Sequence, residues 1–298
     1  LYGTDYSYVT ALGLETHQNG TQKWNSETAD LGLAMPQLYA EAALPWGNGL
    51  NVKAGHFYSI LGYETATSTG NFFYSHSYTR QYGEPLTHTG ALATYCLSPN
   101  CTVQAGFTRG WNNWEDPNNE LGWLLGFSAW TDDGRSTLQF ALHSGDEDRA
   151  GRNNRTSYSL VYQHFGDCAT YVFQHDYGVD QNSAVRGGAA TDAHWLSIVQ
   201  YIYWPLREDI DFGARLEWFN DVHRSRVIQA ANDNGRGGDY SAFTMGLNCR
   251  PTCWVTVRPE LRWDWSDFDV PALGRGGAYD GFTGKSQFTL ACDVIAHF

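Results

Sequence analysis

The segment Ser286-Gln-Phe-Thr-Leu-Ala-Cys-Asp-Val-Ile-Ala-His-Phe298 carries an apolar residue at every second position from Phe288 to Phe298. The positions between them include Asp293 and His297. Successive side chains of an extended strand point to opposite faces, so this segment presents one apolar face and one more polar face. A terminal aromatic residue that closes such an alternation is typical of a strand whose outer face meets lipid and whose inner face meets water.

The same two-residue alternation recurs along the whole chain. A strand that crosses an apolar layer of about 25 Å at a tilt of about 40° needs roughly ten residues. Fourteen segments have lengths near that value: 5–15, 32–44, 50–59, 86–97, 102–111, 121–130, 136–144, 156–165, 169–177, 194–204, 209–220, 239–248, 254–265 and 286–298.

The links between these segments alternate in length. Short links lie at 45–49, 98–100, 131–135, 166–167, 205–208 and 250–252, and longer ones at 17–31, 61–85, 112–120, 145–155, 178–193, 221–238 and 266–285. Tight turns at one end and long loops at the other are the rule for outer-membrane β-barrels. We therefore predict an all-β fold, one antiparallel transmembrane β-barrel over residues 1–298, with a best count of 14 strands in a range of 12–16. An even count places both termini on the periplasmic side, with Phe298 as the C-terminal assembly signal.

The two faces of single strands are clearly different. In 254–265 the apolar face is Val255, Val257, Pro259, Leu261, Trp263 and Trp265, and the other face carries Arg258, Glu260, Arg262 and Asp264. A soluble β-sandwich with this pattern would bury the apolar face in a core and leave the charges in bulk water. Segment 194–204 is apolar on both faces and fits either a place under an inserted loop or a subunit contact.

The composition excludes several classes of protein. The formal net charge of −13 argues against nucleic acid as a partner, which needs a basic surface. No run of eighteen mainly apolar residues occurs, and the mean hydropathy is −0.44, so a transmembrane helix is not expected. Aromatic residues make up 15% of the chain, and many Trp lie near segment ends. Two membrane girdles explain that distribution, and a sugar-binding surface is the alternative, with Trp111 and Trp114 as the expected exceptions to the girdles.

Cysteine and acidic residues provide further candidate sites. Two of the cysteine pairs, Cys96 with Cys101 and Cys249 with Cys253, bracket turns and are predicted to clip hairpins as disulfides in an oxidising compartment. Zinc is not expected, because neither spacing matches a known zinc motif. Acidic segments at 145–148 and 264–269 could hold Ca²⁺ in outer loops, and no other cofactor is expected. No enzyme activity is expected, because neither a nucleophile elbow nor a metal-binding His motif occurs.

A barrel of this strand number would enclose a channel. Fourteen strands spaced 4.8 Å apart at about 40° tilt give a backbone diameter of roughly 28 Å, which side chains do not fill. Loop 61–85 is therefore predicted to fold inward as a constriction, with Glu64, His76 and Arg80 in the passage. Facing them, the predicted wall residues are Lys53, Arg215, Glu217, Arg258, Glu260 and Arg262.

Several motifs in the first third of the chain resemble a known family. They are Pro36-Gln-Leu-Tyr-Ala-Glu41, Gly49-Leu-Asn-Val-Lys-Ala-Gly-His-Phe57, Leu61-Gly-Tyr-Glu64, Asn71-Phe-Phe-Tyr-Ser-His-Ser77, Pro85-Leu-Thr-His-Thr-Gly90 and Gly110-Trp111. As a set they resemble the β-barrel porins of the OmpL-like type. The resemblance implies a bacterial outer-membrane porin and carries over no catalytic residue.

We therefore predict a passive diffusion channel for small hydrophilic solutes and ions, with a weak cation preference from the acidic balance. The alternatives are a structural or adhesive barrel with a plugged lumen and a secreted carbohydrate-binding β protein. The expected partners are outer-membrane lipid, lipopolysaccharide and the barrel-assembly machinery. A homotrimer is expected if segment 194–204 marks a subunit contact.

Overall fold

The computed structural model describes residues 37–114, 116, 118–186, 189–228, 237–269, 274 and 276–298, together with two short strands, β1 (Lys23–Trp24) and β2 (Leu33–Ala34), that pair with each other. The other strands are β3 (Leu38–Leu44), β4 (Leu50–Tyr58), β5 (Thr87–Ser98), β6 (Cys101–Thr108), β7 (Gly122–Trp130), β8 (Ser136–Asp146), β9 (Asn154–Phe165), β10 (Thr170–Arg186), β11 (Ala189–Arg207), β12 (Ile210–Asp221), β13 (Gly238–Thr252), β14 (Val255–Ser266) and β15 (Ser286–Ala296). No helix among the described residues is long and apolar enough to cross a membrane.

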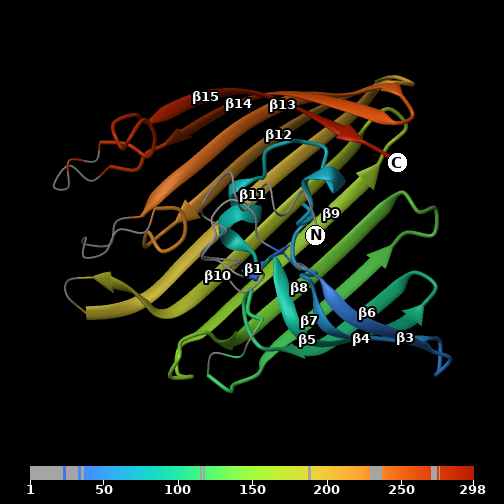
Figure 1. Ribbon diagram of the computed structural model, residues 1–298, viewed down its shortest axis with the longest axis vertical. Helices are drawn as coiled ribbons and strands as arrows, with labels where there is room; N and C mark the ends of the chain where they lie inside the picture. Colours follow the sequence, from blue (N-terminus) through green and yellow to red (C-terminus); the bar gives the residue numbers. More distant parts are fainter. Residues whose placement is uncertain are drawn as a thin grey trace.

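Strands β3 to β15 form one antiparallel sheet in which every strand pairs with its neighbours in the chain. In the described part of the chain β3 and β15 are the two edge strands, and the sheet curves around a central space (Figure 1). The predicted all-β barrel architecture is confirmed, since thirteen of the fourteen candidate segments coincide with these strands. The remaining candidate, 5–15, lies outside the described residues.

The longest hairpin differs from the prediction. Segment 178–193 was expected to be a loop, but β10 and β11 continue through most of it. The cross-strand pairs resume at Ala184 with Thr191 after an irregularity that begins at Asp180. Asn182, inside that irregularity, has φ of 53°, a left-handed conformation that Asn tolerates better than most residues. The polar residues between Asp180 and Ala184 therefore form a bulge, and the hydrogen-bonded ladder between β10 and β11 continues beyond it.

The sheet points its apolar side chains outward. On β14, Trp263 is 56% exposed, whereas Arg258 on the opposite face is 2% exposed. The last strand shows the same arrangement, with Leu290 72% exposed. A soluble sandwich would bury these apolar side chains between two sheets. The observed orientation therefore excludes the sandwich and fits a wall whose outer face meets hydrocarbon.

Strand β11 is apolar on both faces, and the structure shows which face points inward and what covers it. Trp195, Val199 and Tyr201 are fully buried on the inner face, and Trp204 is exposed on the outer face. The Trp195 Nε1 group donates a hydrogen bond to the Gly83 carbonyl oxygen at 3.1 Å. The inner apolar face thus lies under an inserted loop, which is the first of the two predicted alternatives.

The aromatic residues at strand ends fit membrane girdles. Trp46, Trp123, Trp204 and Trp254 are all exposed at or beside the ends of their strands. Amphipathic rings favour the headgroup level of a bilayer, where one edge stays hydrated. Trp111 is buried inside the sheet, which agrees with its predicted exclusion from the girdles.

The two predicted hairpin disulfides are not present, since all six cysteines are free in the structure. Cys96 pairs with Thr102 across the β5–β6 hairpin, and Cys101 pairs with Ser98. Neighbouring residues of a strand point to opposite faces, so Cys96 and Cys101 lie on opposite faces of the sheet. Cys249 lies in β13, and Cys253 is exposed in the turn that follows. Short spacing around a turn did not bring either pair of thiols together.

The orientation of the wall can be tested on β8. Phe140 shares the outer face with Leu138, and Gln139 between them lies on the inner face. We expect Phe140→Arg to lower the free energy of unfolding by about 2–4 kcal/mol, because it places a charge in hydrocarbon. The matched control Gln139→Arg should change it by less than about 1 kcal/mol. Denaturant unfolding of protein refolded into lipid vesicles measures both values, and equal losses would contradict the orientation.

Candidate functional site

The link between β4 and β5, residues 59–86, folds into the space that the sheet encloses (Figure 1). We call it the inserted loop; it contains a 3₁₀ turn at Ser68–Gly70 and a π-helical turn at Thr79–Gly83. Its backbone is held by side chains of the wall. The N–H groups of Tyr63, Ser75 and Tyr78 donate to Gln174 Oε1 at 3.2 Å, Glu260 Oε2 at 3.1 Å and Glu217 Oε2 at 2.6 Å, respectively. A buried backbone without a ladder of its own needs such partners.

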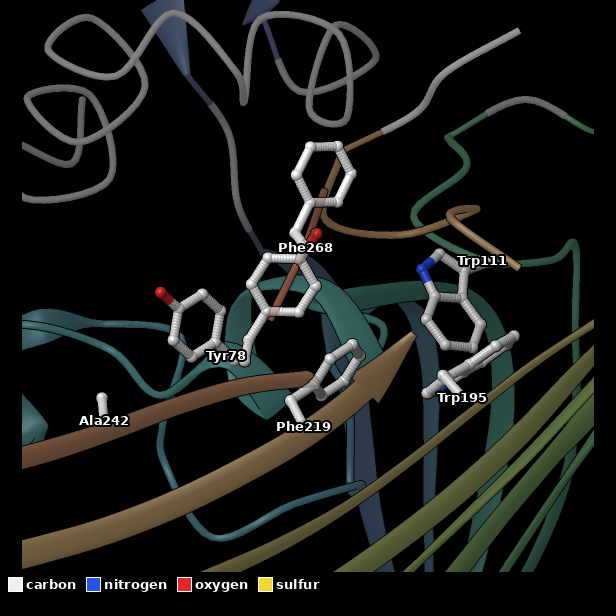
Figure 2. Packing of buried hydrophobic residues seen from close by; sticks show 7 residues of the cluster. Tyr78, Trp111, Trp195, Phe219, Ala242 and Phe268 are labelled. Atoms are coloured by element: carbon white, nitrogen blue, oxygen red, sulfur yellow. The ribbon is translucent and has the colours of Figure 1, made fainter. Parts of the chain in front are cut away.

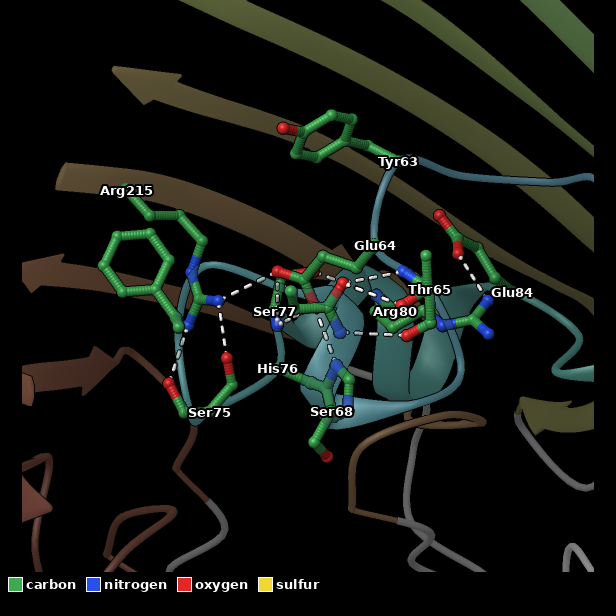
Figure 3. A network of polar contacts seen from close by, with 12 residues as sticks. Tyr63, Glu64, Thr65, Ser68, Ser75, His76, Ser77, Arg80, Glu84 and Arg215 are labelled. Atoms are coloured by element: carbon green, nitrogen blue, oxygen red, sulfur yellow. Dashed lines mark hydrogen bonds and ion pairs between the residues drawn. The ribbon is translucent and has the colours of Figure 1, made fainter. Parts of the chain in front are cut away.

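Glu64 is the centre of the contact between loop and wall. Its carboxylate accepts hydrogen bonds from Arg215 Nη1 at 2.9 Å and from the Tyr201 hydroxyl at 3.0 Å, both on the wall. Within the loop it lies 2.9 Å from His76 Nδ1 and accepts the Ser77 N–H (Figure 3). Burial by itself would raise the pKa of Glu64, but the Arg215 guanidinium and the His76 ring lower it to about 2. Glu64 therefore stays ionised and anchors the loop.

Two further arginines of β14 hold the loop by its carbonyl groups. Arg258 Nη1 donates to the carbonyl oxygens of Ser68 at 2.9 Å and Asn71 at 2.6 Å, while its other nitrogens pair with Asp293. Arg262 Nη1 donates to the His76 carbonyl oxygen at 3.0 Å. A guanidinium carries five N–H donors in a fixed plane, so one side chain can bind a carboxylate and a backbone at once.

The end of the inserted loop is held by a second polar group. Arg80 Nη1 lies 3.1 Å from Glu84 Oε2, and Glu84 accepts a hydrogen bond from Gln174 of β10. The same Gln174 amide donates to Asp176 Oδ2 at 2.7 Å. Since all four side chains are buried, this group fixes the loop against β10 as Glu64 fixes it against β12.

An aromatic cluster covers the loop toward the long-loop end of the sheet. It contains Tyr78, Trp111, Trp195, Phe219, Tyr240 and Phe268 (Figure 2). Val227, Ile228, Ala278 and Phe282, from the links after β12 and β14, pack against it. Arg226 lies over the rings of Trp111 and Trp195, 5.0 and 4.4 Å from their centroids. The half of the lumen beside β11–β14 is thus filled by loops.

The predicted passage residues separate into two groups. Glu64 and Arg80 are 6% and 3% exposed, and they lie with His76, Arg215, Glu217, Arg258, Glu260 and Arg262 in the contacts between loop and wall. Lys53 lies apart from them on the inner face of β4, 3.9 Å from Glu41. All of these predicted residues lie inside the sheet in the structure. The sequence pattern did not show that most of them bind the inserted loop.

The sheet can be divided into two arcs, β10–β14, which binds the inserted loop, and β4–β9. The inner face of β4–β9 carries uncharged polar residues that were not among the predicted passage residues. They are Asn51, Thr94, Gln104, Ser128, Gln139 and Gln163, all of them partly or fully exposed. The sequence does contain the pattern that identifies these inward-facing positions, since Thr, Ser, Asn and Gln alternate there with apolar residues. We call the surface formed by these six side chains the neutral wall; Lys53 of β4 and Arg155 of β9 are charged residues that also face inward on these strands.

The predicted calcium segments have other partners. Both Glu147 carboxylate oxygens accept the Trp111 N–H, and Asp148 accepts the N–H groups of Arg152 and Asn153. Asp264 binds Arg262. Among the described residues no group of three or more His, Cys, Asp or Glu side chains is arranged to hold a metal ion.

The family is now clear from sequence comparison. A family model described as beta-barrel porin-2, OmpL-like, matches residues 1–298. The chain belongs to this porin family. The resemblance seen in its N-terminal motifs is thereby confirmed, and no curated protein matches the chain.

Solved structures show the same fold as this OmpL-like porin. The outer-membrane channel DcaP of Acinetobacter baumannii has a TM-score of 0.55 and 11% identity, covering 93% of this chain and 89% of that one. OprB of Pseudomonas putida has a TM-score of 0.55 and 14% identity, covering 87% and 71%. OmpT of Vibrio cholerae has a TM-score of 0.51 and 10% identity; 73% of this chain matches 66% of that protein. These identities support a shared fold only.

The contacts of Arg215 lead to a test of loop anchoring. Arg215→Met leaves the buried carboxylates of Glu64 and Glu217 without their shared cation, and breaking such a pair costs about 3–5 kcal/mol. We expect faster hydrogen exchange at the Ser77 and Tyr78 amides, measured by mass spectrometry. The control Lys53→Met removes a half-exposed pair worth about 0–1 kcal/mol and should leave those amides protected. Unchanged exchange in Arg215→Met would show that the loop is held elsewhere.

Glu147, in the link after β8, leads to a pH-dependent prediction. Burial raises its pKa to about 7, so the folded protein holds a proton there that the unfolded chain releases near pH 4.5. Stability should fall by up to about 3 kcal/mol as the pH rises from 4.5 to 7 and then level off. Glu147→Gln should remove that slope and match the unmodified protein below pH 4.5. Chemical unfolding across pH 4–8 checks this, with Glu208→Gln, at an exposed turn, as the control. A retained slope in Glu147→Gln would refute the assignment.

Proposed function

We propose that this porin is a passive diffusion channel for small hydrophilic solutes in the bacterial outer membrane. The observation that carries the proposal is the division of its inner surface. The inserted loop covers the charged inner faces of β10–β14 and touches the other arc through Ile60 and Leu61. Beside that contact, the neutral wall of β4–β9 keeps exposed hydroxyl and amide groups. Such groups exchange hydrogen bonds readily with water and with passing solutes. Transport along this surface needs no cofactor and no energy source.

The inserted loop is the proposed constriction. A barrel of this strand number has a backbone diameter of roughly 28 Å, and the loop occupies the half of it beside β11–β14. The passage then runs between the loop and the neutral wall. Charged residues such as Glu64 and Arg80 affect permeation mainly because they hold the loop in place. The position of the loop in turn determines the width of the passage.

A weak cation preference is proposed from the balance of buried charge. The contacts between loop and wall contain four guanidinium groups and six carboxylates: Arg80, Arg215, Arg258 and Arg262 against Glu64, Glu84, Glu217, Glu260, Asp264 and Asp293. Each arginine is paired, and the acidic excess remains. The field of that excess favours cations modestly, because the charges lie behind the loop and water in the passage screens them.

The orientation and partners follow from the same proposal. The long loops face outward and the short turns face the periplasm, with both termini periplasmic and Phe298 as the assembly signal read by the barrel-assembly machinery. The exposed apolar faces of β13–β15 meet lipid, and the outer loops meet lipopolysaccharide. A homotrimer is the proposed assembly if the outer face of β11 is a subunit contact.

A structural barrel with a plugged lumen is the second candidate. The aromatic cluster of Figure 2 favours it, because Val227, Ile228, Ala278 and Phe282, from the described parts of the links after β12 and β14, also pack against the cluster. Single-channel recording separates the two candidates, since a plugged barrel shows no conductance steps in a planar bilayer.

The neutral wall can be tested by placing charge on it. We expect the purified protein to show conductance steps and a small reversal potential of cation-selective sign in a KCl gradient. Gln139→Glu should increase that potential and Gln139→Lys should reduce or invert it, because the side chain is exposed on the inner face. Asp167→Asn, in an exposed turn, is the control. Strong anion selectivity of the unmodified protein, or no response to either Gln139 variant, would refute this passage.

A further inference from the structure

A cavity of about 240 Å³ lies between the inserted loop and β11. Its lining is Tyr63, Glu64, Thr65, Gly70, Asn71, Phe72 and Phe73 from the loop and Tyr201 and Tyr203 from the wall. Thr65 and Gly70 are exposed, so the cavity is open beside them. Drug-sized ligands occupy pockets of about 300–1,000 Å³, so this cavity suits a smaller solute.

The cavity is built mainly of aromatic rings. Tyr63 lies 4.9 Å from Tyr201 between ring centroids, and Phe72 lies 4.8 Å from Tyr203. Tyr63 points away from the polar contacts around Glu64 (Figure 3). Tyr63, Phe72 and Tyr203 are only partly buried, which leaves ring surface facing the cavity. Exposed ring faces of this kind stack against flat, weakly polar surfaces.

The wall is shaped to hold one of these rings. A Cβ atom added at Gly213 of β12 would lie 2.4 Å from the Phe72 ring. Gly213 pairs with Tyr203 across the β11–β12 ladder, so it faces the same cavity. The absence of a side chain there lets Phe72 lie against the strand beside Tyr203. The aromatic lining is therefore held by the backbone as well as by ring contacts.

The charges around the cavity disfavour an ionic ligand. Glu64, its one carboxylate, is already bound by Arg215, His76 and Tyr201. The Arg215 guanidinium lies over the Phe73 ring at 5.1 Å, where a ligand cation would otherwise be placed. A second cation would be repelled, and an anion would meet Glu64. The hydroxyls of Tyr63 and Tyr203 are hydrogen-bonded to each other, and the pair keeps one donor hydrogen and acceptor lone pairs for a neutral ligand.

We propose that this cavity binds the pyranose ring of a neutral sugar as it passes through the channel. A pyranose offers a C–H face to the aromatic rings and hydroxyl groups to the tyrosines at its edge. A linear polyol offers the same hydroxyls without a flat face. The site rests on the proposed channel function, because a solute would reach the cavity, which lies between the inserted loop and β11, from inside the barrel.

The test is block of the ion current by added solute. With the full chain in a planar bilayer, D-glucose should reduce the current at concentrations at least tenfold below those needed for D-sorbitol, a linear hexitol. Tyr203→Leu should raise the half-blocking glucose concentration at least tenfold. Gly213→Ala, which removes no ring but displaces Phe72, should raise it as well. Tyr171→Leu, on the outer face of the adjacent β10, is the matched control and should have no effect.

The outcomes distinguish this site from the channel itself. Conductance steps with equal block by glucose and sorbitol, or stronger block by choline, refute the sugar site and leave the channel. Absence of steps refutes the channel. The site is then measured by calorimetric titration of glucose into detergent-solubilised protein, where binding must be present and must be lost in Tyr203→Leu. Retained binding in that variant overturns the proposal, and heat-modifiable gel migration verifies that each variant is folded.

Discussion

A loop without a hydrogen-bonded ladder can remain inside a barrel only if its backbone groups find partners there. In this porin the charged inner faces of β12 and β14 provide them. Arg258 and Arg262 bind carbonyl oxygens of the inserted loop, and Glu217 and Glu260 bind its N–H groups. The Glu64–Arg215 ion pair connects the two sets of contacts. The position of the loop, the shape of the cavity and the separation of the lumen into two arcs all depend on these bonds.

The fold could be predicted from the sequence because a membrane barrel has a strictly local pattern. Side chains alternate between lipid and lumen with a period of two residues, so each strand carries its own evidence. The segment 254–265 shows this well: its tryptophans are on the outer face and its arginines on the inner face, as its alternation indicates. Strand ends were less well predicted. The β10–β11 hairpin is longer than expected because a bulge near Asn182 lets pairing resume beyond polar residues.

The candidate site could be predicted only in part, because its contacts join distant positions. Glu64 and Arg215 are 151 residues apart, and no local pattern indicates that they meet. Inward-facing charge was visible in the sequence, but burial under a loop was not. The cysteines show the opposite error. Cys96 and Cys101 are close in sequence, but Cys96 pairs with Thr102, the neighbour of Cys101 in β6, so the two cysteines lie on opposite faces of the sheet.

The division of the lumen into two arcs has a consequence for how such a protein can diverge. Residues of the neutral wall have few partners, so a descendant sequence can exchange them one at a time and acquire a new permeability without unfolding. Residues such as Arg215 and Glu64 must change together, because either one alone leaves a buried charge. Relatives with different permeabilities should therefore differ most along β4–β9 and retain the anchoring of the inserted loop.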